Sequence, residues 1–194
     1  MLCCKMPYPL PQRKSFSMKK ALIILVIAAL AATGGFAVRS YLNQQADANN
    51  PALGQIRPEF AAPDINGEYQ NIKQYDGKLV LLNFWATWCP PCKHEIPAFI
   101  ALQNEYGSQG FQIVGLAIDD EDAVAGFIEE IGMNYPTMVV QQAGIELARR
   151  YGNDQGVLPY SVLIDRDGRI VYTISGELSK KRARELLSAH GIKL

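Results

Sequence analysis

Two cysteines, Cys89 and Cys92, stand between two segments of different apolar pattern. Residues 78–84 before them form a short, mostly apolar run, which is typical of a buried strand. The residues after them carry apolar side chains at helical spacing, namely Ile96, Phe99, Leu102 and Tyr106. A Cys-X-X-Cys loop between a strand and a helix puts Cys89 at a helix N-terminus. There, free N–H groups and the helix dipole favour the reactive thiolate.

An uncharged apolar stretch at residues 21–38 is long enough to cross most of a bilayer as a helix. Lys19 and Lys20 precede it, whereas only Arg39 follows it closely. Because basic flanks tend to stay in the cytoplasm, this bias predicts that residues 1–20 are a cytoplasmic segment. We therefore expect a transmembrane signal-anchor at residues 21–38, with the rest of the chain outside the cytoplasm.

The beginning of the chain has a second interpretation. Met18 and the two lysines after it look like the start of a signal sequence, so residues 1–17 are either an upstream extension or a mis-set start. The small residues Ala29, Ala31, Gly35 and Ala37 fit a cleavage site, so a removed signal peptide is the alternative to a retained anchor. We favour a retained anchor, because the apolar run continues to Val38 without a polar break.

Residues 39–56 are mostly polar and lack apolar periodicity, so they are predicted to be a linker before a domain at residues 57–194. Charge is distributed unevenly along the chain. The first 39 residues hold six basic and no acidic residues, and the remainder holds 13 basic against 19 acidic residues, a net charge of −6. Such an acidic domain is a poor nucleic-acid binder, so we expect no nucleic-acid partner.

The cysteine distribution indicates a reactive pair. Cys3 and Cys4 precede the apolar stretch and are predicted to be cytoplasmic and reduced, which leaves Cys89 and Cys92 as the cysteines of the exported part. A disulfide that closes so short a loop stabilises little. No metal site is predicted, because four good ligands are lacking and neither histidine stands at a ligand spacing from the pair. The pair is therefore better explained by thiol–disulfide exchange than by stabilisation.

Strand and helix patterns alternate through the expected domain. An Asn-Gly turn at residues 66–67 predicts a hairpin near its start. Further strands are predicted at residues 78–85, 111–118, 137–140, 160–164 and 169–174. Besides the helix that follows Cys92, helices are predicted at residues 120–131 and 145–151 and after the N-cap Ser179. This order predicts an α/β sandwich with a mixed sheet.

The chain resembles the thioredoxin superfamily, and specifically the membrane-anchored TlpA/ResA-like thiol-disulfide oxidoreductases. The matching residues are Trp85, Trp88, Cys89-Pro90-Pro91-Cys92, Pro97 and Gly156-Val157-Leu158-Pro159. The resemblance implies a thioredoxin-like sandwich with a central mixed sheet, an N-terminal hairpin and a helix–strand insertion at residues 120–140. It also implies a cis peptide bond before Pro159, packed beside the active-site disulfide. The expected substrate-binding residues are Trp88, Pro90, Pro91, Leu158 and Pro159.

One departure from thioredoxin concerns the acid beneath the disulfide. Thioredoxin has a buried Asp there, and the matching residue of this chain is Asn83, which cannot take up a proton. Glu95, three residues after Cys92, matches an acidic residue of the ResA-like group. We expect Glu95 to be a catalytic residue that tunes the thiols or relays protons. The alternative is an ordinary solvated carboxylate on the helix surface.

The order of the two cysteines suggests their roles. Cys89 is expected to be the exposed nucleophile and Cys92 the resolving thiol. Because Pro90 and Pro91 lack N–H groups, the Cys89 sulfur would depend on the amides of Cys92 and Lys93. A thiolate with few donors is less stabilised, which favours a reducing role.

These expectations combine into a disulfide reductase that works in the periplasm or extracytoplasmic space, tethered to the bacterial inner membrane. Its clients would be exported disulfide-bearing proteins, for example during cytochrome c maturation, and its electron donor a membrane thiol reductant. It would need no cofactor beyond the redox-active disulfide of Cys89 and Cys92. An alternative is a thioredoxin-fold module that delivers a metal or holds an apocytochrome. Peroxidase activity is disfavoured, because the Pro-x-x-x-Thr-x-x-Cys pattern of peroxiredoxins is absent around Cys89.

Overall fold

A computed structural model describes residues 22–25, 27, 30, 34–35 and 50–194. The chain divides into two units, residues 1–42 and residues 43–194. In the first unit the described residues are helical. Most of the expected anchor, the segment at residues 1–20 and most of the expected linker lie outside the described residues. Of the helices that are described, none is both long and apolar enough to span a bilayer.

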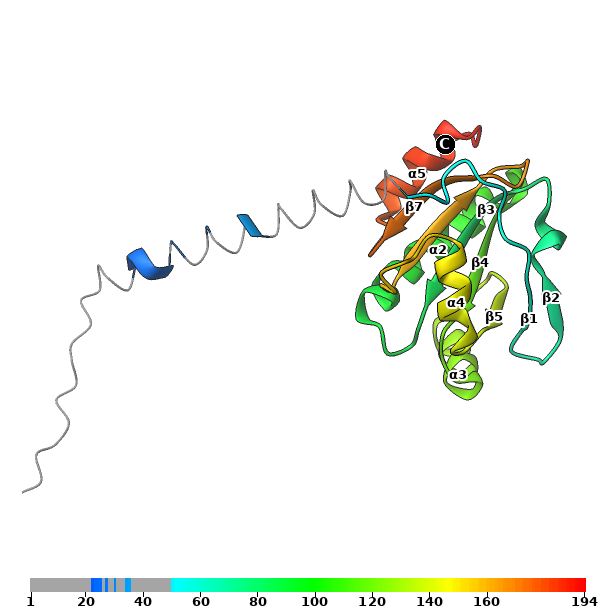
Figure 1. Cartoon of the computed structure of the whole chain (residues 1–194), viewed down its shortest axis with the longest axis horizontal. Coiled ribbons are helices and arrows are strands. Elements are labelled where there is room, and N and C mark those ends of the chain that lie inside the picture. Colours follow the sequence, from blue (N-terminus) through cyan, green and yellow to red (C-terminus); the bar gives the residue numbers. More distant parts are fainter. Residues whose placement is uncertain (1–21, 26, 28–29, 31–33, 36–49) are drawn as a thin grey trace, which may run out of the picture. The chain divides into compact units, whose positions relative to one another are not determined.

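The second unit is built on a five-stranded sheet with the strand order β5-β4-β3-β6-β7 (Figure 1). Its strands are β3 (Leu79–Trp85), β4 (Phe111–Ala117), β5 (Thr137–Val139), β6 (Tyr160–Ile164) and β7 (Ile170–Ser175). Strands β3, β4 and β5 are parallel, whereas β6 is antiparallel to both β3 and β7. A separate hairpin pairs β1 (Ala61–Pro63) with β2 (Tyr69–Asn71). The mixed sheet and the N-terminal hairpin are thus confirmed.

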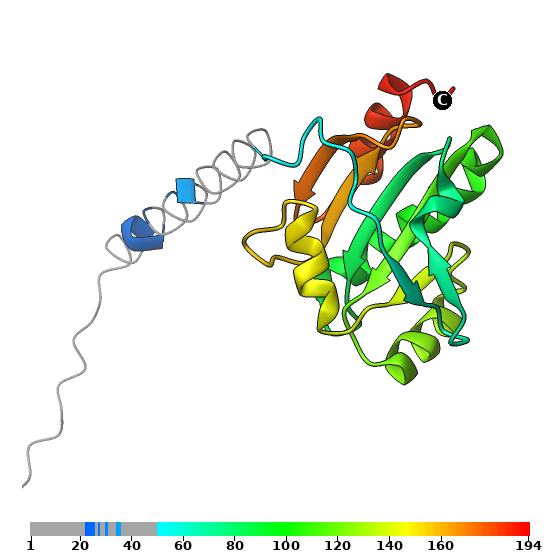
Figure 2. The same cartoon turned by 45° about the vertical axis from the view of Figure 1, so that its right-hand side comes forward.

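Helices cover both faces of this sheet (Figure 2). They are α2 (Pro90–Tyr106), α3 (Glu121–Ile131), α4 (Ala143–Arg150) and α5 (Lys180–Ala189), with the short 3₁₀ helices η1 (Ile72–Tyr75) and η2 (Gly107–Gln109). Side chains of β3 alternate between two apolar clusters: Leu81 lies with residues of α2, α3 and α5, and Leu82 lies with residues of α4. Because both faces are covered, every residue of β3 is buried, which explains why all of its residues except Asn83 are apolar.

The packed domain begins earlier than the sequence predicted. Within residues 50–56, which were assigned above to the linker, Asn50, Ala52 and Gly54 contact the domain directly. Asn50 Nδ2 donates hydrogen bonds to the Tyr160 hydroxyl at 2.9 Å and to the Gly152 carbonyl at 3.0 Å. The Gly54 amide donates to the Ile170 carbonyl at 2.8 Å. These contacts join residues more than a hundred positions apart, so the polar composition of the segment gave no sign of them.

Candidate active site

The two cysteines lie where β3 gives way to α2. Cys89 is the N-cap of α2, with an extended backbone at φ −96° and ψ 103°. Pro90 and Pro91 occupy the first two helical positions, where a missing N–H costs no helical hydrogen bond. The predicted helix N-terminus at Cys89 is therefore confirmed.

Cys89 and Cys92 form a disulfide, with their Cα atoms 5.3 Å apart. Cys92 is fully buried and Cys89 is 4% exposed, so the expectation of an openly exposed Cys89 is wrong for the disulfide form. The Cys92 amide donates to Cys89 Sγ at 3.3 Å. The Lys93 amide donates instead to the carbonyl oxygen of Cys89, which corrects the expected second donor to the sulfur. It does so because the carbonyl of an N-cap residue accepts the first bond of its helix.

The residues expected to bind substrate lie around this disulfide. The Trp88 side chain is 65% exposed, and both prolines of the loop are exposed. Pro159 is buried and follows a cis peptide bond, as predicted. Since Tyr160 of β6 pairs with Phe84 of β3, Pro159 lies beside the end of β3 from which the cysteine loop departs. Leu158, half-buried, packs against the apolar cluster that contains both cysteines.

Glu95 lies in the interior and not on the helix surface. It is 2% exposed, which excludes the alternative of a solvated carboxylate. Its Oε1 accepts a hydrogen bond from Asn83 Nδ2 and its Oε2 accepts one from the Leu178 amide, both at 2.8 Å. Burial raises the pKa of Glu95 to about 8. The two hydrogen bonds lower this pKa, and the charge of Glu177 raises it further.

Asn83 connects Glu95 to the neighbouring strand. It is fully buried in β3, and its Nδ2 also donates to Ser161 Oγ of β6 at 3.0 Å. Its Oδ1 has no hydrogen-bond partner among the described residues. At neutral pH the site thus holds a protonated carboxyl group one helical turn from Cys92. Hydrogen bonds connect this group through Asn83 of β3 to Ser161 of β6.

Three contacts of this site were not predicted from the sequence. The Leu178 amide and Ser161 reach Glu95 and Asn83 from elements far away along the chain. Asp119 accepts hydrogen bonds from Thr87, two residues before Cys89. A polar residue directly after a predicted strand was the one available signal for Asp119, because the carboxyl ends of parallel strands share an edge of the sheet.

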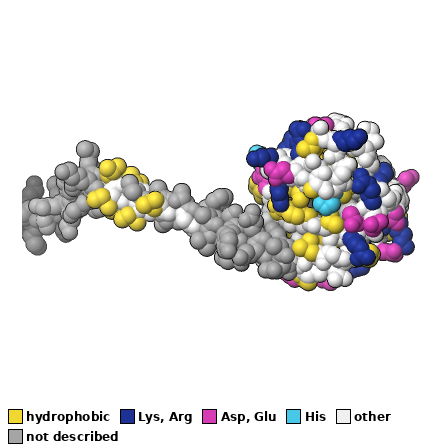
Figure 3. All heavy atoms as spheres, turned by 90° about the horizontal axis from the view of Figure 1, so that it is seen from above, with side chains coloured by type: hydrophobic (Ala, Val, Ile, Leu, Met, Phe, Trp, Pro, Cys, Tyr) yellow, Lys and Arg dark blue, Asp and Glu magenta, His cyan; other side chains and the backbone are white. Residues whose placement is uncertain are grey.

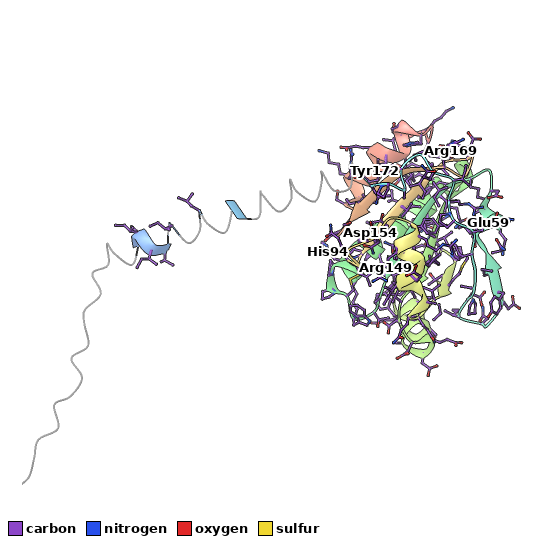
Figure 4. All side chains as sticks on the ribbon, in the orientation of Figure 1. Glu59, His94, Arg149, Asp154, Arg169 and Tyr172 are labelled. Atoms are coloured by element: carbon purple, nitrogen blue, oxygen red, sulfur yellow. A yellow bond between two sulfur atoms is a disulfide. The ribbon has the colours of Figure 1, made fainter. Side chains whose placement is uncertain are left out.

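One histidine lies at the surface and the other at a helix end. His94 is exposed and its Nδ1 lies 2.8 Å from Glu177 Oε1, whereas His190 follows the last residue of α5. Figure 4 shows His94 on the side of the domain away from Glu59. Within the described part of the chain, no group of three or more His, Cys, Asp and Glu side chains is arranged to hold a metal.

Comparison with known proteins agrees with this geometry. Residues 53–173 match the model of the AhpC/TSA family. Thiol-disulfide oxidoreductase ResA of Bacillus thuringiensis (strain Al Hakam) is 35% identical over 165 residues, which cover 84% of this chain and 93% of the relative. ResA of Geobacillus thermodenitrificans (strain NG80-2) is 31% identical over 173 residues, covering 89% and 94% of the two chains. A thiol:disulfide interchange protein of the thioredoxin family from Chlorobium tepidum TLS superposes with a TM-score of 0.64 at 30% identity, covering 72% of this chain and 97% of the other.

Proposed function

We propose that this chain reduces disulfides in exported proteins, since it belongs to the AhpC/TSA family and is a ResA-like thiol-disulfide oxidoreductase. Cytochrome c maturation is the setting we propose for it. The observation that carries the direction is the hydrogen bonding of the Cys89 sulfur. It accepts from the Cys92 amide, while Pro90 and Pro91 contribute no donor. A less stabilised thiolate makes the dithiol form the better reductant.

The proposed reaction begins from the reduced pair. The Cys89 thiolate attacks one sulfur of a client disulfide, so that a mixed disulfide forms and one client thiolate leaves. Cys92, once deprotonated, attacks Cys89 Sγ, which forms the Cys89–Cys92 bond and releases the second client thiolate. The client thereby gains two electrons and, after protonation, two protons. A membrane dithiol reductant returns the pair to the reduced form by the same exchange.

Glu95 is proposed to move the proton that this cycle requires. Cys92 is buried, so its thiol proton needs an internal acceptor before the second attack. The pKa of about 8 that burial gives Glu95 lies much nearer to that of a thiol, about 8.5 for an ordinary cysteine, than the pKa of an ordinary carboxyl group does. Matched pKa values let a proton pass between two groups with little cost. The ionised fraction of Glu95, which grows as pH rises toward its pKa of about 8, would take the Cys92 proton in reduction, and the protonated form would return a proton when the disulfide opens.

The location of the domain is also a proposal. We infer that residues 21–38 anchor the chain and that the domain faces the periplasm or extracytoplasmic space. The uncharged apolar stretch and the basic residues before it support this topology. Export would bring the disulfide to a compartment where client proteins carry disulfides of their own.

Trapping tests the proposal, because a protein without the resolving thiol cannot complete the second attack. Cys92→Ala in the full chain should accumulate mixed disulfides with exported proteins, which non-reducing electrophoresis detects. The double variant Cys89→Ser, Cys92→Ala is the control and should trap none. An absence of trapped clients, with Cys89 still alkylated readily in the isolated protein, would contradict client reduction. Tight stoichiometric copper binding without turnover of an oxidised protein would favour the metal-delivery alternative.

A further inference from the structure

The segment that connects β3 to the disulfide receives few backbone hydrogen bonds of its own. Strand β3 ends at Trp85, and the helical bonds of α2 begin at Cys89. Within the connection, the Cys89 amide donates to the Ala86 carbonyl at 3.2 Å. Trp88 is 65% exposed, so its side chain contributes little packing that would fix the path of the chain. The position of Cys89 therefore depends strongly on how Thr87 is held.

Asp119 holds Thr87 from the neighbouring strand. A single carboxylate oxygen, Asp119 Oδ2, accepts from the Thr87 amide at 2.8 Å and from its hydroxyl at 2.5 Å. Hydrogen bonds to a charged acceptor are stronger than those between neutral groups. One side chain thus satisfies both donors of the residue in the middle of the connection.

Asp119 is itself fixed in place. It follows β4 after Ile118, whose amide donates to the Trp85 carbonyl at 2.9 Å and extends the ladder between β3 and β4. Its other oxygen, Oδ1, accepts from the Asp120 amide at 2.9 Å. Partial burial raises the pKa of Asp119, but the hydrogen bonds from Thr87 and Asp120 outweigh it and lower this pKa. The carboxylate is therefore ionised at neutral pH and anchored to the sheet.

We propose that Asp119 is a positioning residue for thiol–disulfide exchange: through Thr87 it sets the path of Trp88 and Cys89. This path keeps the Cys89 sulfur on the Cys92 amide and keeps Trp88 at the surface beside the disulfide. The inference rests on exchange chemistry at Cys89 and does not depend on the proposed direction or client.

Two other roles for Asp119 make different predictions. A merely structural carboxylate would change stability and leave exchange by folded molecules unaltered. A carboxylate that acted through its charge would disfavour the Cys89 thiolate, so that its removal lowers the pKa of the Cys89 thiol whatever side chain replaces it. Asp119→Asn removes the charge and keeps an oxygen for Thr87, whereas Asp119→Ala removes both. The difference between the two variants therefore isolates the hydrogen bonds to Thr87.

The experiment uses the full chain with Asp119→Ala, Asp119→Asn, Thr87→Val and Thr87→Ser. Asp122→Asn is the matched control, since this exposed carboxylate lies in the first turn of α3. The measurements are Tm, the pH dependence of Cys89 alkylation in the reduced protein, and kcat and KM for reduction of an oxidised model protein such as insulin.

We expect Asp119→Ala to have kcat/KM about tenfold lower than Asp119→Asn, and a higher pKa of the Cys89 thiol. Thr87→Val should lose part of the activity, and Thr87→Ser and Asp122→Asn should retain it. Equal kcat/KM in all variants, with only Tm changed, would overturn the proposal. So would a pKa of the Cys89 thiol lowered equally in Asp119→Ala and Asp119→Asn. Failure of the wild-type protein to reduce insulin would count against the proposed function. The comparison of Cys89 alkylation among the variants would still decide the role of Asp119.

Discussion

At the scale of single residues, Glu95 is the feature that distinguishes this site. A carboxyl group that is 2% exposed, with hydrogen bonds from Asn83 and Leu178, has a pKa raised by burial to about 8. Buried carboxyl groups with strongly shifted pKa values cluster at functional sites. The burial of Glu95 therefore supports its proposed role in proton transfer more strongly than its sequence position did.

Stability should depend on pH through Glu95. Its folded-state pKa of about 8 lies above the ordinary value of 4.5, so between these values the folded state keeps a proton that the unfolded state has released. The free energy of unfolding therefore falls as pH rises through this window. At about 1.4 kcal/mol per pKa unit the loss across the whole window is on the order of 5 kcal/mol. Glu95→Gln should remove most of this dependence in urea unfolding between pH 5 and pH 9.

Glu95→Gln has a matched control, and one result would contradict the predicted pH dependence. The Asn83 Oδ1 atom, which has no partner among the described residues, could accept from the Gln amide after rotation of the Asn83 side chain, so the variant should fold. Glu130→Gln changes an exposed carboxylate in α3 and should leave the pH dependence as in the wild type. If Glu95→Gln kept the wild-type slope as well, Glu95 would not be the group that titrates.

At the scale of elements, α3 of the insertion supports the base of the disulfide loop. The centroids of the Phe127 and Trp85 rings lie 5.4 Å apart, and Lys93 Nζ also lies 5.4 Å from the centroid of the Phe127 ring. Trp85 is the last residue of β3 and Lys93 follows Cys92, so Phe127 contacts both sides of the loop. The insertion therefore contacts the residues on both sides of the disulfide loop and is a structural part of the site.

Truncation of Phe127 should therefore weaken both the fold and the site. Phe127→Ala removes a partly buried ring and its contacts with Trp85 and Lys93. We expect a loss of about 2–3 kcal/mol in the free energy of unfolding, measured by urea denaturation. Phe127→Leu should retain most of it, because an apolar side chain of similar volume remains. Equal stability of the alanine variant and the wild type would show that α3 does not support the loop.

The contribution of the N-cap of α5 can be tested with a single substitution. Ser179 Oγ accepts from the Arg182 amide at 3.3 Å at the N-terminus of α5, as the sequence predicted. Ser179→Ala should cost about 1 kcal/mol of unfolding free energy, measured in the same way. Ser188→Ala, in the exposed last turn of α5, is the matched control and should be close to neutral. A neutral result for Ser179→Ala would mean that packing alone fixes the start of α5.

The sequence predicted elements better than contacts, for a physical reason. Apolar spacing and turn residues are local, so β3, β4 and α3 lie within two residues of the predicted ranges. The burial of Glu95 could not be predicted in this way, because Leu178, which donates to it, is 83 positions away. The same holds for Asp119 and Thr87, which are 32 positions apart. Such contacts follow from the packing of strands and loops, for which the place of Asp119 directly after a predicted strand was the one local sign.

At the scale of the whole molecule, side chains of both charge signs are interspersed over the face of the folded unit seen in Figure 3.

Residues just before the predicted domain form hydrogen bonds across the folded unit. The Asn50 amide connects the start of the described domain to Gly152 and Tyr160. Residues 50–56 therefore belong to the folded unit.

A substitution at Asn50 tests this connection. Asn50→Ala should lower the free energy of unfolding by about 1–2 kcal/mol, because it removes two side-chain hydrogen bonds across the domain. Gln74→Ala, at an exposed position of η1, should change it little. A neutral Asn50 variant would show that residues 50–56 contribute no stability through this side chain.

The reduction potential of the Cys89–Cys92 pair is the most direct test of a reducing oxidoreductase. It is measured by equilibrating the protein with defined ratios of reduced and oxidised dithiothreitol or glutathione and trapping the free thiols. Because the Cys89 sulfur has the Cys92 amide as a donor and none from Pro90 or Pro91, we predict a potential more reducing than about −200 mV, toward that of thioredoxin. A potential near about −120 mV, where disulfide-forming enzymes lie, would contradict the proposed direction.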